Sequence, residues 1–343
     1  MIQTMNPKVG FAAPAHVVGP RLYAIDTAKG LGIVLVVFGH AWRGVQGAGL
    51  LADGPLFSAV DQMIYAFHMP LFFFLSGLLF LEILQKAEPG SFAVTRAVRL
   101  LWPFVLWTWV FFGFKWAAGP IVNEPVVMSD FPLWPFPPYE HLWFLWALWL
   151  CQMVAMAGYL VLRPVVQPGH LRTVCAVGAV AMTLLIPLIY IPSVTWGAPA
   201  QHFPYFIAGI ALGGVAHLRP PVWLVAVAGL AFALLLSLSA HIQAALLVSL
   251  ALTVLFCVVV AGVDRKGPQA GRFIAMLRYL GGASLVIYLA HTVFSAGTRI
   301  LLTSGGVTSV PVHLVTEVGV GLAGPIVLLW ISRRLGMAKV LGL

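Results

Sequence analysis

Lys29 and His40 share one apolar segment, DTAKGLGIVLVVFGHAWRG (26–44). His40 follows Lys29 by 11 residues, which on an α-helix places the two within about 20° of each other and about 16 Å apart along the axis. Asp26 precedes Lys29 by one turn and is close enough to pair with it. An imidazole suits proton transfer near neutral pH, and an ammonium group suits an anionic ligand. The segment therefore predicts a stripe along which such a ligand lies.

Each residue of this stripe also has a structural interpretation. A lysine at the inner end of a first membrane span is often only an anchor. A histidine inside a span either hydrogen-bonds to another helix or takes part in catalysis. Gly30, Gly32 and Gly39, near the stripe, either admit a ligand or allow another helix to pack closely. The spacing alone leaves both interpretations open.

A second histidine stands beside a proline in FHMPLFFFLSG (67–77). Pro70 loosens the helical hydrogen bonds next to His68. This feature either shapes a catalytic site beside His40 or only kinks a helix that carries a satisfied histidine. Farther along, TRAVRLLWP (95–103) places Arg96 and Arg99 on one helix face, where they either bind phosphate groups or act as topology determinants.

Polar and aromatic residues open a later span in PYEHLWFLWALW (138–149). Glu140 and His141 either bind a hydroxyl-bearing substrate or cap the helix. Trp143 and its aromatic neighbours stack on sugar rings or anchor at the membrane interface.

The segment GGASLVIYLAHTVF (281–294) carries Tyr288 and His291 near mid-depth of a span. Beyond it, Arg299 and Glu317 are expected to pair and to serve the structure.

The elements that must position these residues are membrane helices. Of the 343 residues, 61% are hydrophobic and 8% are charged, compared with about 45–50% and about 25% in soluble domains. The apolar residues form repeated runs near the length of about 20 residues that spans a bilayer. The N-terminal residues lack the apolar region of a signal peptide, so we expect no removable leader.

We predict an all-α polytopic bundle of ten spans with both termini in the cytoplasm. Residues 1–28 form a cytoplasmic arm, 29–335 the membrane domain and 336–343 a cytoplasmic tail. Under this topology all the lysines and arginines except Arg43, Lys115 and Arg299 lie on the cytoplasmic side, as the positive-inside rule requires. The predicted spans are 30–48, 59–83, 100–119, 141–162, 171–192, 202–216, 221–239, 242–263, 282–302 and 310–332.

Several functions lack local support. The three cysteines have no paired spacing, so neither a disulfide nor a metal site is expected. The net charge of +9 is spread over loops and predicts no nucleic-acid binding. No P-loop, G-x-S-x-G or H-E-x-x-H motif is present. A transporter or exporter remains the alternative to an enzyme, although we find no internal repeat of the kind that many transporters have.

The ordered motifs resemble acyltransferase family 3, and within it the fucose 4-O-acetylase group. The family's hallmark is a basic residue, ten intervening residues and a histidine, which Lys29 and His40 match. The matching segments are IDTAKGLGIVLVVFGH (25–40), FHMPLFFFLSG (67–77), RAVRLLWP (96–103), HLWFLWALW (141–149), FPYFIAGIALG (203–213) and GGASLVIYLAHTVF (281–294).

The resemblance implies transfer of an acyl group, usually acetyl, from cytosolic acetyl-CoA or another acyl-CoA to a sugar hydroxyl of a surface polysaccharide or lipid-linked glycan. It implies a bacterial inner membrane location, contact with membrane lipid and no metal. Family precedent makes His40 essential and places Lys29, Arg96 and Arg99 at the CoA end. To these we add His68 as a second catalytic candidate, and Glu140, His141, Trp143 and His291 as acceptor-binding candidates.

Overall fold

The computed structural model describes residues 23–215, 219–240, 245–265 and 269–343, and these residues form α-helices and short 3₁₀ turns without a β-strand. The all-α prediction is confirmed. The predicted N-terminal arm, residues 1–28, lies outside the described residues up to position 22, and its residues from Tyr23 onward are helical. The helices are α1 (Tyr23–Gly47), α2 (Pro55–Tyr65), α3 (His68–Leu84), α4 (Pro89–Ala118), α5 (Trp143–Leu162), α6 (Pro168–Leu185), α7 (Val194–Leu212), α8 (Val222–Ser239), α9 (Leu246–Val263), α10 (Arg272–Gly282), α11 (Ser284–Ser304) and α12 (Val310–Arg334).

Nine helical segments within the described ranges are long and apolar enough to cross a membrane. They correspond to nine of the ten predicted spans. The remaining predicted span, 202–216, corresponds to α7, which contains Pro199 and Pro204 and is not among the nine. Large apolar side chains are exposed along many helices, as contact with lipid requires. The chain is therefore an integral, multi-pass membrane protein.

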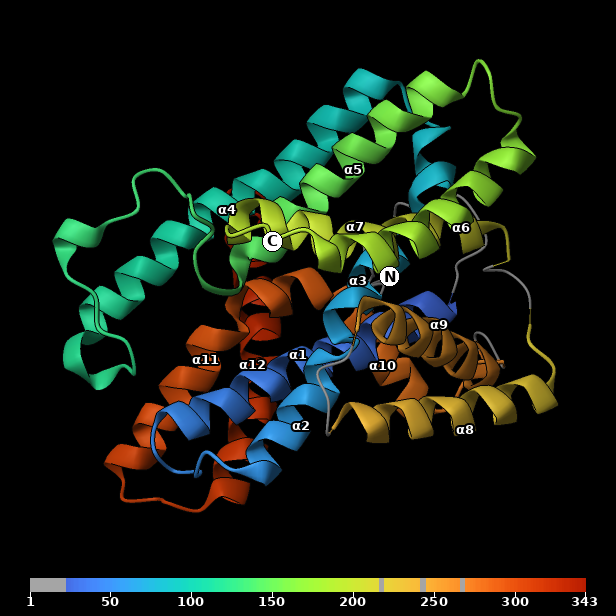
Figure 1. Cartoon of the computed structure of the whole chain (residues 1–343). Helices are drawn as coiled ribbons and strands as arrows, with labels where there is room; N and C mark the ends of the chain where they lie inside the picture. The colour runs from blue at the N-terminus through green and yellow to red at the C-terminus, as the bar shows by residue number, and fades with distance from the viewer. Residues whose placement is uncertain (1–22, 216–218, 241–244, 266–268) are drawn as a thin grey trace, which may run out of the picture.

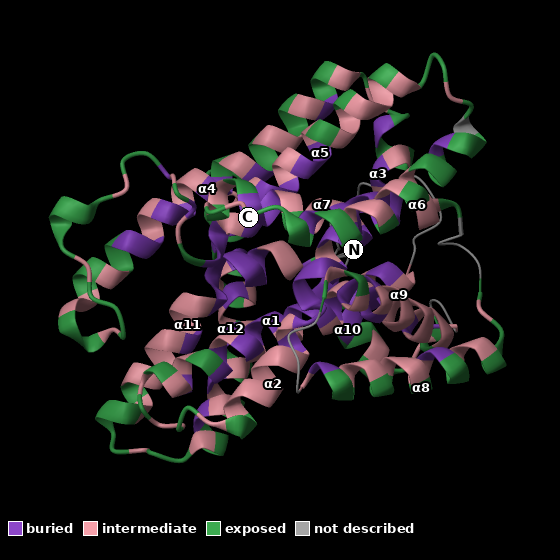
Figure 2. Cartoon of the chain, in the orientation of Figure 1, coloured by how far each residue is buried: buried purple, intermediate pink, exposed green. Residues whose placement is uncertain are grey.

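Helix α1 lies at the centre of the bundle and packs against α3, α9, α10, α11 and α12 (Figure 1). Figure 2 shows buried residues gathered where these helices meet, and exposed residues on the loops. The approach of α1 to α10 depends on glycine, because a side chain at Gly30 would meet the backbone of Leu277 and one at Gly281 would meet the backbone of Asp26.

A buried ion pair also fixes the start of α1. Asp264, at the end of α9, accepts hydrogen bonds from the Thr27 hydroxyl (2.6 Å) and from Arg278 Nε (3.1 Å), and its second oxygen pairs with Arg278 Nη2. The Arg278 guanidinium also lies over the ring of Tyr23, 4.4 Å from its centre. Three helices therefore meet in one polar contact two residues before Lys29.

Helix α4 begins at Pro89, well before the predicted start at residue 100. Glu88 caps it, because its carboxylate accepts a hydrogen bond from the backbone N–H of Ser91 (2.9 Å), and this hydrogen bond lowers the pKa of the Glu88 carboxyl. Arg96 and Arg99 therefore lie within α4, before the start of the predicted span 100–119. In Figure 1, α4 and α5 run side by side as a hairpin.

The residues after α12 return to α4. The indole of Trp102 donates to the carbonyl of Val340 (2.8 Å), and that of Trp107 donates to the carbonyl of Leu341 (3.0 Å). The predicted tail therefore packs on the part of α4 that follows Arg99.

Candidate active site

Three imidazoles from three separate elements meet inside the bundle. His40 comes from α1, His291 from α11, and His141 from the 3₁₀ turn η3 (Glu140–Leu142) before α5. The ring centre of His40 lies 5.0 Å from that of His291 and 5.5 Å from that of His141, and the centres of His141 and His291 are 5.1 Å apart. We call His40, His141 and His291 the histidine cluster. Two of the four acceptor-binding candidates therefore lie beside the catalytic candidate His40.

Hydrogen bonds to backbone carbonyls hold two members of the cluster. His291 Nδ1 lies 2.9 Å from the carbonyl oxygen of Ile287 and 2.8 Å from that of Tyr288. His141 Nε2 lies 3.1 Å from the same Tyr288 oxygen, and the Tyr288 hydroxyl donates to the carbonyl of His141. Tyr288 thus joins α11 to η3 through both its backbone and its side chain.

His40 is held differently from the other two members. Within the described part of the chain no hydrogen bond engages either of its ring nitrogens. Its side chain is only partly buried, whereas His141 and His291 are buried. His40 is therefore the member of the cluster that a reactant can reach and whose ring is free to reorient.

His68 lies beside the cluster without a ring contact to it among the described residues. It begins α3, its Nδ1 lies 2.7 Å from the carbonyl oxygen of Ile64, and its ring meets the edge of Tyr65 at 4.6 Å. His40 is within electrostatic range of it. The structure therefore brings His68, at the start of α3, within electrostatic range of His40.

The basic candidates gather at the other end of the α1 stripe. Asp26, Arg96 and Arg99 all lie within electrostatic range of Lys29. The guanidinium of Arg96 is also stacked over Phe92, 5.0 Å from the ring centre, and Arg99 is exposed. Helices α1 and α4 thus present three cations at one end, and α1 leads from them to His40.

Glu140 and Trp143 have partners of their own. Glu140 forms an ion pair with Lys115, which also lies 3.4 Å from Glu124. The Trp143 ring packs against His202 at 5.0 Å and lines a cavity of about 330 Å³ together with His202 and Gln201. His202 is not among the candidates chosen from the sequence. The signal that identified His40, a histidine within an apolar segment, is present at His202 as well.

The predicted pairing of Arg299 with Glu317 is confirmed, with 2.9 Å between Nη1 and Oε2. His313 Nδ1 lies 3.2 Å from the second carboxylate oxygen of Glu317. Each of the three cations assigned to the outer side therefore has an acidic partner, Arg43 pairing with Asp61.

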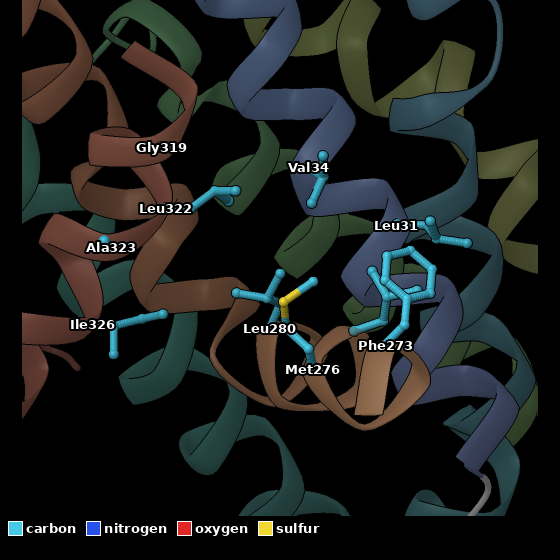
Figure 3. Close-up of a pocket in the computed structure, with 10 residues that line it drawn as sticks. Leu31, Val34, Phe273, Met276, Leu280, Gly319, Leu322, Ala323 and Ile326 are labelled. Atoms are coloured by element: carbon cyan, nitrogen blue, oxygen red, sulfur yellow. The ribbon is translucent and has the colours of Figure 1, made fainter. Parts of the chain in front are cut away.

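An apolar cavity of about 390 Å³ lies apart from the cluster, between α1, α10 and α12 (Figure 3). Its walls include Leu31, Met276, Leu322 and Ile326. Because none of the described residues that line it has an ionisable side chain, this cavity suits an apolar chain and not proton transfer.

We expect Glu140→Gln to leave activity at its original level, because Lys115 already engages this carboxylate. The Glu140 side chain is 39% exposed and that of Lys115 is 23% exposed, so loss of the pair should lower stability by less than about 1 kcal/mol. Thermal unfolding in detergent and the transfer rate at subsaturating acceptor check this prediction. A large rise in the acceptor KM would instead give Glu140 a direct role in binding.

The comparisons with known proteins agree with the residue patterns. A family model described as an acyltransferase domain matches residues 22–333. A nodulation protein, NolL of Mesorhizobium japonicum, is 33% identical over 100 residues. That alignment covers 29% of this chain and 26% of the relative, so the chain matches about a quarter of that protein's length. No solved structure matches the chain.

Proposed function

This chain belongs to the acyltransferase 3 family of membrane proteins, and from that membership we propose that it is an O-acyltransferase that uses a cytosolic acyl-CoA, most simply acetyl-CoA. We propose a sugar hydroxyl of a surface polysaccharide or lipid-linked glycan as the acceptor, as in the fucose 4-O-acetylase group. Its place is a bacterial inner membrane, with both termini in the cytoplasm.

This proposal rests on the α1 stripe, the face of α1 that carries Lys29 and His40. One helix joins Lys29, with the charges of Arg96 and Arg99 near it, to a partly accessible His40 whose ring nitrogens are not engaged within the described residues. The phosphates of CoA suit the cationic end. The extended pantetheine arm then reaches toward His40, at the depth where α1, α11 and η3 meet.

At that point the chemistry needs a base. His40 accepts the proton of the acceptor hydroxyl while the hydroxyl oxygen attacks the thioester carbonyl, and the new C–O bond forms. The intermediate then collapses, the C–S bond breaks, and the proton on His40 passes to the departing sulfur, which leaves as the thiol of CoA. A covalent acyl-histidine is the alternative course, in which His40 itself is acylated first.

The acceptor is expected on the side of the cluster formed by η3 and α5. His141 lies in the cluster, and Trp143, two residues later, offers an aromatic surface next to Gln201 and His202. Aromatic faces and amide or imidazole groups are suited to sugar rings and their hydroxyls. His68, near His40 but hydrogen-bonded to Ile64, is a second candidate for proton transfer.

A transfer assay with purified protein in liposomes tests the proposal. Acetyl-CoA labelled in the acetyl group is supplied with candidate glycans, and the label is followed into product by mass spectrometry. Label in an O-acyl sugar supports the enzyme. Movement of unmodified glycan across the liposome membrane, with no label transferred, would support a transporter instead.

Neutralising the basic end should weaken donor binding more than it slows chemistry. We expect Lys29→Gln or Arg99→Gln to raise the KM for acyl-CoA by about 10-fold, equivalent to about 1.4 kcal/mol, with little change in kcat, because each removes a charge that binds the donor's phosphates in both ground and transition states. Initial rates over a range of acyl-CoA concentrations measure both constants. Arg163→Gln, at the exposed end of α5, is the matched control and should change neither.

A further inference from the structure

The carbonyl oxygen of Tyr288 fixes where the protons of two cluster histidines lie. A carbonyl oxygen only accepts hydrogen bonds, so each ring nitrogen that bonds to one must carry the hydrogen. Nδ1 of His291, bonded to the Ile287 and Tyr288 oxygens, is therefore the N–H of that ring. Nε2 of His141, bonded to the Tyr288 oxygen, is the N–H of the other.

The two neutral rings are therefore opposite tautomers. His291 keeps a lone pair on Nε2, and His141 keeps one on Nδ1. The Nε2 atom of His291 is buried and has no hydrogen-bond partner among the described residues, and the whole residue is 0% exposed. Leaving a buried acceptor without a donor is unfavourable, so we expect this atom to find a donor in some state of the enzyme.

Among the described residues, the ring whose centre lies nearest to that of His291 is His40. Its centre is 5.0 Å from the centre of His291, and its own nitrogens are not held by any described residue. The 5.0 Å between the ring centres is short enough for an N–H···N hydrogen bond from His40 to the Nε2 atom of His291 once the His40 ring is suitably oriented. A substrate atom has less access, because His291 is fully buried.

We propose that His291 is a positioning residue for His40. Its Nε2 lone pair accepts a hydrogen bond from one ring nitrogen of His40, which orients the other nitrogen toward the acceptor hydroxyl. This inference rests on the proposed function, and it gives His291 a role different from the direct acceptor contact that its place in the sequence suggests. In the transfer step the hydroxyl proton moves to the free nitrogen of His40, and the His40–His291 hydrogen bond stays in place until that proton leaves with the thiol.

Asparagine and glutamine at position 291 separate this role from a structural one. Asn places its amide near Nδ1 and keeps the bond to the helix carbonyls, but it lacks an acceptor at the Nε2 position. Gln places its amide oxygen near Nε2 and gives up the bond to the carbonyls. We expect His291→Asn to lower kcat by about 10- to 100-fold at unchanged KM for both substrates, the range typical of losing a group that orients a histidine. His291→Gln should recover much of that loss.

A purely structural role predicts the opposite order, with Asn close to wild type and Gln impaired. That order would overturn the proposal, and so would a raised acceptor KM with unchanged kcat in His291→Asn, which would make His291 a substrate ligand. Amounts of folded protein are compared by size-exclusion chromatography so that kcat refers to folded enzyme. Should both variants fail to fold, His291→Ala with added imidazole replaces them, and absence of any recovery of transfer would then count against the proposal.

Position 141 supplies the mirror-image control. At position 141 the nitrogen bonded to the Tyr288 carbonyl is Nε2, and the lone pair is on Nδ1. Glutamine therefore keeps the bond to Tyr288, and asparagine keeps the acceptor. Because the tautomers are opposite, the amide that keeps the carbonyl bond is Asn at position 291 and Gln at position 141, and yields of folded protein in the reverse order at both positions would overturn the tautomer assignment. If His40→Ala retains transfer, the proposed function itself fails; if His40→Ala is inactive but the order at position 291 is reversed, only this inference fails.

Discussion

His40→Ala is expected to abolish acyl transfer while the protein remains folded. Alanine removes the only cluster histidine of which neither ring nitrogen is engaged among the described residues, and with it the proposed base for the acceptor hydroxyl. A positioned general base contributes about 100- to 10,000-fold to a rate. The transfer of labelled acetyl groups, measured per amount of folded protein in liposomes, should therefore fall to the background of the assay.

The control for this change is another histidine outside the cluster. His170 is exposed near the start of α6, and His170→Ala should keep both abundance and transfer. Near-normal transfer by His40→Ala would show that His40 is not the base. Acetyl label trapped on His40 in the wild-type protein, detected by mass spectrometry of peptides, would instead favour the acyl-histidine course.

Hydropathy was sufficient to predict most of the membrane helices, but it could not place every break. Pro70 has no N–H and cannot donate to the carbonyl of residue 66, so one helical hydrogen bond is lost there. The structure accordingly ends α2 at Tyr65 and begins α3 at His68. The sequence predicted the loosened bonds, but not that the helix would divide into two.

Two helical segments were missed for the opposite reason, because polar residues dilute their hydropathy. The first turns of α4 contain Ser91, Thr95 and Arg96, and the predicted span therefore began only at residue 100. The capping signal was available, since Glu88 precedes Pro89 at the first helical position. Helix α10 (Arg272–Gly282) is short and amphipathic and lies outside any apolar run of spanning length.

The histidine cluster itself could not be derived from local patterns. Tyr288 and His141 are 147 residues apart in the chain, and nothing in the spacing of either segment fixes their contact. What brings them together is the packing of α11 on α1 and the double contact of Tyr288 with η3. The Lys29 to His40 stripe was accessible from sequence because both residues lie on one helix, where periodicity determines relative position.

The glycines near that stripe had two interpretations, and the structure favours packing for all three. A side chain at Gly30 would meet the Leu277 backbone, one at Gly32 would meet the ring of Phe72, and one at Gly39 would lie against Ile64. Close helix contact therefore determines the position of α1, and with it the position of Lys29 and His40. The position of the Lys29 to His40 stripe depends on a backbone contact between α1 and α10.

That contact makes Gly281→Leu the substitution with the largest expected effect on the fold. A Cβ atom at position 281 would collide with the carbonyl oxygen of Asp26 and would lie 3.0 Å from the amide nitrogen of Gly30, and neither backbone atom can move aside by changing a rotamer. Overpacking by a few methylenes ordinarily costs about 1–3 kcal/mol, and a clash with backbone should exceed that. We therefore expect almost no folded protein, judged by size-exclusion chromatography of the detergent-solubilised chain.

The adjacent Gly282 is the matched control, because it is exposed and no atom lies within 4 Å of a Cβ added there. Gly282→Leu should give wild-type amounts of active protein, and equal losses at both positions would show that the α1–α10 contact is not what fixes the position of Lys29 and His40.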